Sequence, residues 1–210
     1  MWMLLLALNS ADAAEQAVTL SGAWSGAEPR VELGTFRRLD SGVQLGAMVQ
    51  VGQARGVYLD GWPVTGGRTR AVLGSVTVPL IQRGVQMDLR LDLGPQFLAA
   101  TETTGPHSSA FGVRGVLSPM ATVPLGERAA LRLGWSFKYA MELDPVRDTE
   151  AQAFIIRGGV NLALSQSVQL AALVESGSVF GFDGDGAKYL NRGTLGVRWT
   201  PASATPWFNL

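Results

Sequence analysis

The stretch VQMDLRLDL, residues 85–93, decides the fold of this chain. Every odd-numbered position carries a large apolar side chain, and every even-numbered position carries a polar or charged one. Because successive side chains of a β-strand point to opposite faces, this alternation predicts a strand with one apolar and one charged face. Such a strand either turns its charged face to water or lines a polar lumen while its apolar face touches lipid.

The same alternation recurs along most of the chain. We expect strands over residues 17–25, 30–38, 43–52, 70–81, 85–97, 111–123, 129–143, 153–164, 168–175 and 189–200. Residues 53–69 are rich in glycine and are predicted as one long loop, with residues 57–59 fitting a strand extension or a short hairpin instead. The pattern therefore predicts about ten strands; losing the weak second strand gives eight, and a hairpin within 53–69 gives twelve.

The connections between these strands alternate in length from the middle of the chain onwards. Short turns are expected at 82–84, 125–128 and 165–167, and longer polar connections at 99–109, 144–150 and 176–187. Short turns at one rim and long loops at the other are typical of outer-membrane barrels. If both termini lie at the short-turn rim, the number of strands must be even.

The composition narrows the class of protein further. Of the 210 residues, 47% are apolar and only 16% are charged, below the roughly 25% charge usual in soluble domains. The absence of cysteine excludes disulfides and thiolate metal sites, and a single histidine gives no basis for a histidine metal site. With a net charge of +0, nothing supports a surface for nucleic acid, so we expect no nucleic-acid partner and no cofactor.

The ends of the chain differ from its middle. Residues 1–14 combine a short apolar run with Ala11-Asp12-Ala13 and form a candidate signal peptide, although a positive first segment is missing and a buried N-terminal segment is the alternative. Residues 15–200 are expected to form a single barrel domain, and residues 201–210 a C-terminal tail. No other run approaches the ~20 apolar residues of a spanning helix.

Two readings of the alternating strands compete. In a secreted soluble β-barrel or sandwich that binds a ligand, the apolar face is the core and the charged face meets water. In a transmembrane barrel the apolar face meets lipid and the charged face lines the interior. Long strands and small residues on the polar face, as a crowded lumen needs, favour the antiparallel up-and-down transmembrane β-barrel. These small residues are Gly46, Gly52, Gly74, Gly134, Ser136 and Gly196.

The candidate signal, the alternating strands and the run Thr194-Leu195-Gly196-Val197-Arg198-Trp199 together resemble the outer-membrane β-barrel proteins of Gram-negative bacteria. That run looks like the closing strand recognised by the barrel-assembly machinery; either it or the tail ending in Trp207-Phe208-Asn209-Leu210 would supply the signal. The resemblance implies a porin-like protein in the outer membrane of a Gram-negative bacterium. It also implies contact with outer-membrane lipid and lipopolysaccharide, and a protein partner at the outer loops.

Candidate catalytic and metal-binding residues are few. His107 and Ser109 match the H-x-S letters of outer-membrane lipid A deacylases, but a solvated loop histidine explains His107 as well. The run Asp183-Gly184-Asp185-Gly186 resembles part of a Ca²⁺ loop without its distal glutamate. One histidine is too few for the strand-top Asp and His groups of the ten-stranded omptin proteases. We expect no enzyme and no metal site.

The charges of the predicted polar face are the most informative set. Isolated charges away from water are costly, so in a narrow barrel they should pair across the lumen and plug it. The sequence thus predicts a non-enzymatic structural or interaction protein; the alternative is a narrow pore whose Arg-rich lining favours anions. The candidate lumen-lining residues are Glu32, Asp88, Arg90, Asp92, Arg114, Arg132, Lys138, Glu142, Arg157, Glu175, Arg192 and Arg198.

Overall fold

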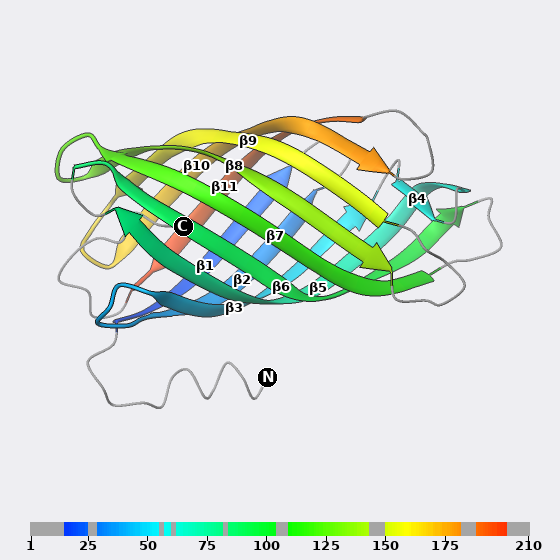
Figure 1. Ribbon diagram of the computed structural model, residues 1–210, viewed down its shortest axis with the longest axis horizontal. Coiled ribbons are helices and arrows are strands. Elements are labelled where there is room, and N and C mark those ends of the chain that lie inside the picture. The colour runs from blue at the N-terminus through cyan, green and yellow to red at the C-terminus, as the bar shows by residue number, and fades with distance from the viewer. Residues whose placement is uncertain are drawn as a thin grey trace.

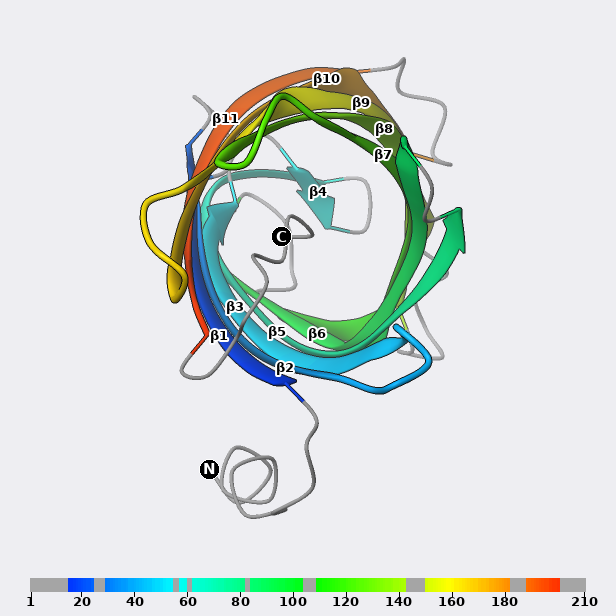
Figure 2. The same ribbon diagram turned by 90° about the vertical axis from the view of Figure 1, so that its left-hand side faces the viewer.

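The strands follow one another around a ring in chain order (Figures 1 and 2). The computed structural model describes residues 15–24, 29–54, 57–59, 62–81, 84–103, 109–142, 150–181 and 188–200. Its strands are β1 (Glu15–Trp24), β2 (Arg30–Arg38), β3 (Gln44–Ala54), β4 (Val57–Leu59), β5 (Trp62–Ile81), β6 (Gln86–Thr103), β7 (Ser109–Pro124), β8 (Ala129–Glu142), β9 (Glu150–Ala163), β10 (Val168–Gly181) and β11 (Lys188–Trp199).

The ring is closed by hydrogen bonds between its first and last strands. Strand β1 pairs antiparallel with β11, from Val18 opposite Trp199 to Trp24 opposite Gly193. Strand β3 pairs directly with β5, so β4 is not one of the strands that form the ring. The other ten strands complete it. The predicted antiparallel up-and-down barrel of about ten strands is therefore confirmed. These ten strands have 9 to 20 residues, and a tilted strand crosses a membrane with about 9–11.

The predicted long loop over residues 53–69 is wrong. Strand β3 continues to Ala54, and β4 pairs with the start of β5, with Leu59 opposite Trp62. The short hairpin is thus present, yet twelve strands do not follow because β4 has only three residues. Two of the glycines that suggested a loop, Gly66 and Gly67, lie inside β5, where the pairing register shifts on either side of Gly66. Figure 2 shows β4 within the outline of the ring, and Figure 1 places it at one end of the barrel.

The predicted long connections at 99–109 and 176–187 are in part strand, because β6 continues to Thr103 and β10 to Gly181. Both ends of the barrel nevertheless lie at one rim. The start of β1 and the end of β11 lie at the same rim as the short β2–β3 and β9–β10 turns, since Glu15 is opposite Arg38 and Trp199 is opposite Val168. In the turn between β7 and β8, Gly126 adopts a φ of 107°, which L side chains rarely accept. Among the residues that the structure describes, no helix is long and apolar enough to cross a membrane.

The outer wall of the barrel is apolar on every strand of the ring. Large apolar side chains are exposed there, including Leu20 (β1), Leu33 (β2), Val49 (β3), Val76 (β5), Leu91 (β6), Leu117 (β7), Leu133 (β8), Ile156 (β9), Val174 (β10) and Val197 (β11). The buried side chains, in contrast, include many that are polar or charged. A soluble barrel has the opposite arrangement, so the alternative of a secreted soluble binding protein is wrong for this fold.

One small residue of the predicted polar face lies on the other face. Gly74 is exposed on the outer wall between Val72 and Val76, whereas Leu73 and Ser75 point inward and are buried. The prediction placed Gly74 with the polar residues because glycine has no side chain to mark its face. The neighbouring period-two pattern of β5 assigns it correctly.

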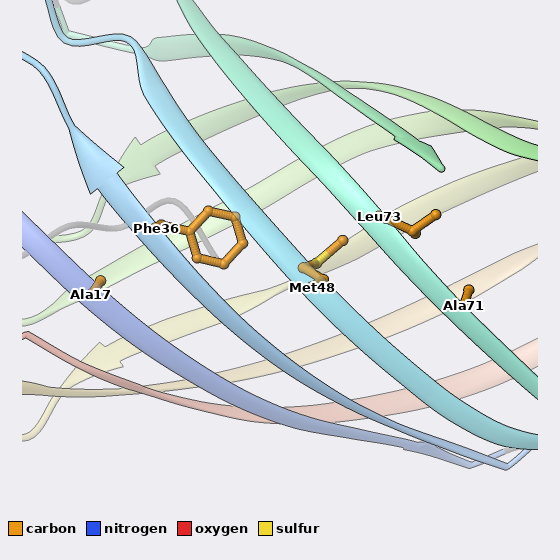
Figure 3. Close-up of a cluster of buried hydrophobic side chains, with 5 residues drawn as sticks. All are labelled: Ala17, Phe36, Met48, Ala71 and Leu73. Atoms are coloured by element: carbon orange, nitrogen blue, oxygen red, sulfur yellow. The ribbon is translucent and has the colours of Figure 1, made fainter. Parts of the chain in front are cut away.

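A buried apolar cluster occupies one side of the interior (Figure 3). Phe36, with a 4% exposed side chain, is packed with Met48, Leu73, Ala17 and Ala71.

Phe36 packs over glycine. It lies opposite Gly46 on β3, and a Cβ atom at Gly46 would overlap its ring. A Cβ at Gly34 would lie 2.8 Å from Cε2 of the same ring. The two glycines therefore form a slot in the wall that accepts the aromatic ring.

Leu91 tests the apolar outer wall. It is 47% exposed and lies near the middle of the apolar run of β6, whereas Leu125 is 58% exposed in the turn after β7. Leu91→Arg is expected to lower the free energy of unfolding in lipid vesicles by about 2–4 kcal/mol, and Leu125→Arg by about 0–1 kcal/mol. Denaturant titration of the vesicle-inserted protein measures both. Equal, small effects would contradict a lipid-facing wall.

The slot around Phe36 gives a second prediction. Gly46→Ala should lower the free energy of unfolding by about 1–3 kcal/mol because the new methyl group meets a ring held by its neighbours. The control is Gly22→Ala, whose Cβ has no atom within 4 Å and should change stability by less than about 0.5 kcal/mol. The double variant Gly46→Ala/Phe36→Leu should recover part of the loss. An unchanged Gly46→Ala protein would refute the slot.

A charged lumen as the candidate functional site

Eleven of the twelve predicted lumen-lining residues have side chains that the structure describes. Ten of them line two interior cavities, and Arg192 is buried against Glu175. The side chain of Glu142, the last residue of β8, lies outside the described part of the structure. The structure thus brings the predicted residues together on the inner wall, while their functional role stays a prediction.

Glu175 is the centre of a row of ion pairs on the inner wall. It lies on β10 directly opposite Arg157 of β9 and Arg192 of β11. One carboxylate oxygen is 2.7 Å from Arg157 Nε, and the other accepts a hydrogen bond from Arg192 Nε. With Glu175 only 2% exposed, the charges of the row compensate one another where water cannot. Three adjacent strands are joined by this row.

A second network crosses the lumen. On β2, Arg30 Nε lies 2.7 Å from Glu32 Oε1, and the same oxygen accepts a hydrogen bond of 2.9 Å from Gln50 Nε2 on β3. Arg114 Nη1, from β7, donates a 2.8 Å hydrogen bond to Gln50 Oε1. Strands β3 and β7 are not neighbours in the ring. The Arg114 side chain therefore bridges the interior rather than lying along its own wall.

Arg90 and Phe36 meet near the middle of the lumen. From β6, Arg90 forms an ion pair of 2.8 Å with Asp92 and donates a hydrogen bond of 2.7 Å to Met48 Sδ on β3. Its guanidinium carbon lies 5.3 Å from the centre of the Phe36 ring, and that of Arg198 lies 5.9 Å from it. Both distances fit cation–π contacts. Side chains from β2, β3, β6 and β11 thus meet at the same height along the barrel axis, which we call the level of Phe36.

This level separates two cavities. The larger, of about 100 Å³, is lined toward the long-connection rim by residues that include Arg30, Glu32 and Lys138. The smaller, of about 30 Å³, is lined toward the short-turn rim by residues that include Asp88 and Arg132. Both cavities share Phe36, Arg90, Arg157 and Leu173 as lining residues. These four side chains lie where the two cavities adjoin, and we refer to them together as the partition.

Among the described residues that line the two cavities, basic groups outnumber acidic ones in each, although the whole chain is neutral. Five basic residues (Arg30, Arg90, Arg114, Lys138 and Arg157) and three acidic ones (Glu32, Asp92 and Glu175) line the larger cavity. Four basic residues (Arg90, Arg132, Arg157 and Arg198) and one acidic one (Asp88) line the smaller. The interior is therefore an environment that attracts anions.

Several residues of the lumen were not among the predicted site residues, and four of them take part in the contacts described above: Arg30, Phe36, Met48 and Gln50. A signal for them was available, because all four are even-numbered and share the period-two face of Glu32 and Gly46. Arg30 stands at the first position of its strand, and Phe36 and Met48 are apolar, so a search for charged residues inside strands passes over them.

Of the candidate catalytic and metal-binding residues, the described part of the structure includes only Ser109. His107 and the run Asp183-Gly184-Asp185-Gly186 lie outside the described residues, and Ser109 is the exposed first residue of β7. Within the described ranges, no group of three or more His, Cys, Asp or Glu residues is placed to hold a metal ion.

Comparison with known proteins finds similarity of shape and none of sequence. No family model matches the chain. No curated protein matches it either. Among solved structures it is similar to OmpT, an outer membrane protein of Vibrio cholerae, with 10% identity, a TM-score of 0.41 and coverage of 82% of this chain and 56% of that one. The chain thus spans about half the length of that protein.

Two further barrels are similar over nearly their whole length. The KdgM porin has 9% identity and a TM-score of 0.40, with 87% of this chain and 98% of that chain covered. The β domain of the Bordetella autotransporter BrkA has 15% identity and a TM-score of 0.45, with 90% and 99% covered. The strand pairing and apolar outer wall of the chain itself identify its fold as a ten-stranded transmembrane β-barrel.

Proposed function

We propose that this protein is a non-enzymatic outer-membrane barrel that serves as a structural or interaction platform and keeps its lumen closed. The observation that carries the proposal is the partition formed by Phe36, Arg90, Arg157 and Leu173 between the two cavities. A barrel with a solute path needs continuous space from rim to rim. The side chains of the partition lie between the two cavities, which supports a lumen without such a path.

The energetics of the lumen support closure. A ten-stranded barrel is only slightly wider than the eight-stranded barrels whose interiors side chains just fill, and wide channels need about sixteen strands. Opening the lumen would break the contacts that cross it, such as those of Arg114 with Gln50 and of Arg90 with Met48. The closed state is therefore favoured over an open one.

The outer wall and the rims support the proposed surroundings. An apolar belt around the whole ring matches lipid, and short turns on the rim that carries both ends of the barrel match the inner side of an outer membrane. We therefore place the protein in the outer membrane of a Gram-negative bacterium, in contact with lipid and lipopolysaccharide. The barrel-assembly machinery would insert it, and a protein partner would bind at the rim of the long connections.

A narrow pore is the second candidate. The observation in its favour is the excess of basic over acidic residues in both cavities. If the partition moves aside, this lining would attract small anions and repel cations. The two candidates differ in one property, which is whether the resting barrel conducts ions.

Planar lipid bilayers separate the two candidates. The wild-type barrel is expected to give no reproducible unit conductance steps. Phe36→Ala is expected to give them because removing the ring joins the two cavities. Phe111→Ala is the control, since Phe111 is 52% exposed on the outer wall of β7, and it should stay silent.

Each outcome of the conductance experiment is decisive. Unit steps from the wild-type protein would contradict the closed lumen and favour the anion pore. Silence of a correctly folded Phe36→Ala barrel would contradict the role of Phe36 in the partition. Folding of each variant is checked by heat-modifiable migration on a gel.

A further inference from the structure

We propose that the larger cavity of the lumen is a binding site for one small oxyanion, such as phosphate or sulfate. The cavity lies between the partition and the rim of the long connections, and its volume is about 100 Å³. A water molecule occupies about 30 Å³ of liquid, so the cavity has room for a tetrahedral anion. The inference does not depend on conduction, because an anion can be held in a closed barrel as well as in a pore.

The charges of the cavity favour an anion. Each of its three carboxylates is already in an ion pair: Glu32 with Arg30, Asp92 with Arg90, and Glu175 with Arg157. Glu175 also binds Arg192, a further buried cation of the inner wall. Against three carboxylates stand five basic residues, so the lining alone has a net positive charge. Uncompensated charge in an enclosed site is costly, and a bound anion removes that cost.

Lys138 adds a further positive charge to the cavity. From β8, it lines the cavity together with Arg30 and Arg114, and both Glu32 and Glu175 attract it. Like charges gathered around an ammonium group repel it in proportion to their proximity. An oxyanion among these side chains would convert that repulsion into attraction. The position beside Lys138 is therefore where we place the anion.

The hydrogen-bond donors of the cavity fit the oxygen atoms of an oxyanion better than an anion that accepts no directional hydrogen bonds. Guanidinium groups present several N–H donors in a planar fork that matches carboxylate, sulfate and phosphate oxygens. Arg30, Arg114 and Arg157 reach the cavity from β2, β7 and β9, at different points of the ring. The residues Thr19, Ser21 and Thr194 contribute hydroxyl groups to the same lining. Donors converging from several sides suit a tetrahedral ligand.

Equilibrium dialysis of the folded, detergent-solubilised barrel with radiolabelled phosphate, at constant ionic strength, tests the site. We expect saturable binding of one phosphate per barrel, with sulfate competing. Lys138→Met should weaken binding about tenfold or more, because it removes a nearby charge and keeps the length of the side chain. The matched control is Arg128→Met, which removes a positive charge from an exposed turn and should leave the affinity unchanged.

A variant of opposite sign protects the test against a folding defect. Glu32→Gln removes a negative charge from the lining, keeps an oxygen for the Gln50 hydrogen bond, and should tighten phosphate binding about tenfold. Absence of saturable binding to the wild-type barrel would overturn the proposal, and so would equal affinities of the wild-type, Lys138→Met and Glu32→Gln proteins. Conductance of the wild-type barrel with intact binding would overturn only the closed lumen.

Discussion

A strand that crosses a membrane finds no water for its backbone N–H and C=O groups, so each of these groups needs a partner within the protein. The pairing of β1 with β11 meets this requirement by removing the free edges of the sheet. Once the ring is closed, the period-two alternation leaves each side chain only two environments. Leu91 and its outer neighbours face lipid, while Asp88, Arg90 and Asp92 are enclosed. The apolar wall and the charged lumen thus follow from one constraint.

Enclosure then determines what the interior charges can do. In water, Glu175 could lie alone; inside the barrel it stands between Arg157 and Arg192 on the two adjoining strands. The apolar side of the lumen is organised by the same crowding, because Phe36 fits only where Gly34 and Gly46 leave space for its ring. Ion pairs and the aromatic ring lie where two cavities adjoin, and the described lining of each cavity has more basic than acidic residues. The proposed closure and the proposed anion site both rest on this arrangement.

The sequence predicted the class of the fold because alternation is a local property. Residues 85–93 show both faces within one strand, and their assignment needed no knowledge of the partners. Local reasoning failed where glycine obscures the pattern: Gly74 lies on the outer wall, and Gly66 lies in a bulge of β5 rather than in a loop. Contacts across the lumen, such as Arg114 to Gln50, are set by closure of the ring and were beyond prediction from either strand alone. Phe36 was missed because an inward aromatic residue follows no charge pattern.

The central claim is that the odd-numbered residues of β6 face hydrocarbon and the even-numbered ones face an enclosed interior. The chain contains no cysteine, so single cysteines can be introduced and spin-labelled at residues 89, 90, 91 and 92 of the barrel in lipid vesicles. Collision rates with oxygen, which concentrates in lipid, and with a water-soluble nickel complex are then measured by electron paramagnetic resonance. We predict high oxygen and low nickel collision rates at residues 89 and 91. At residues 90 and 92 we predict either the reverse or low collision rates with both reagents. High nickel collision rates at 89 and 91 would contradict the account.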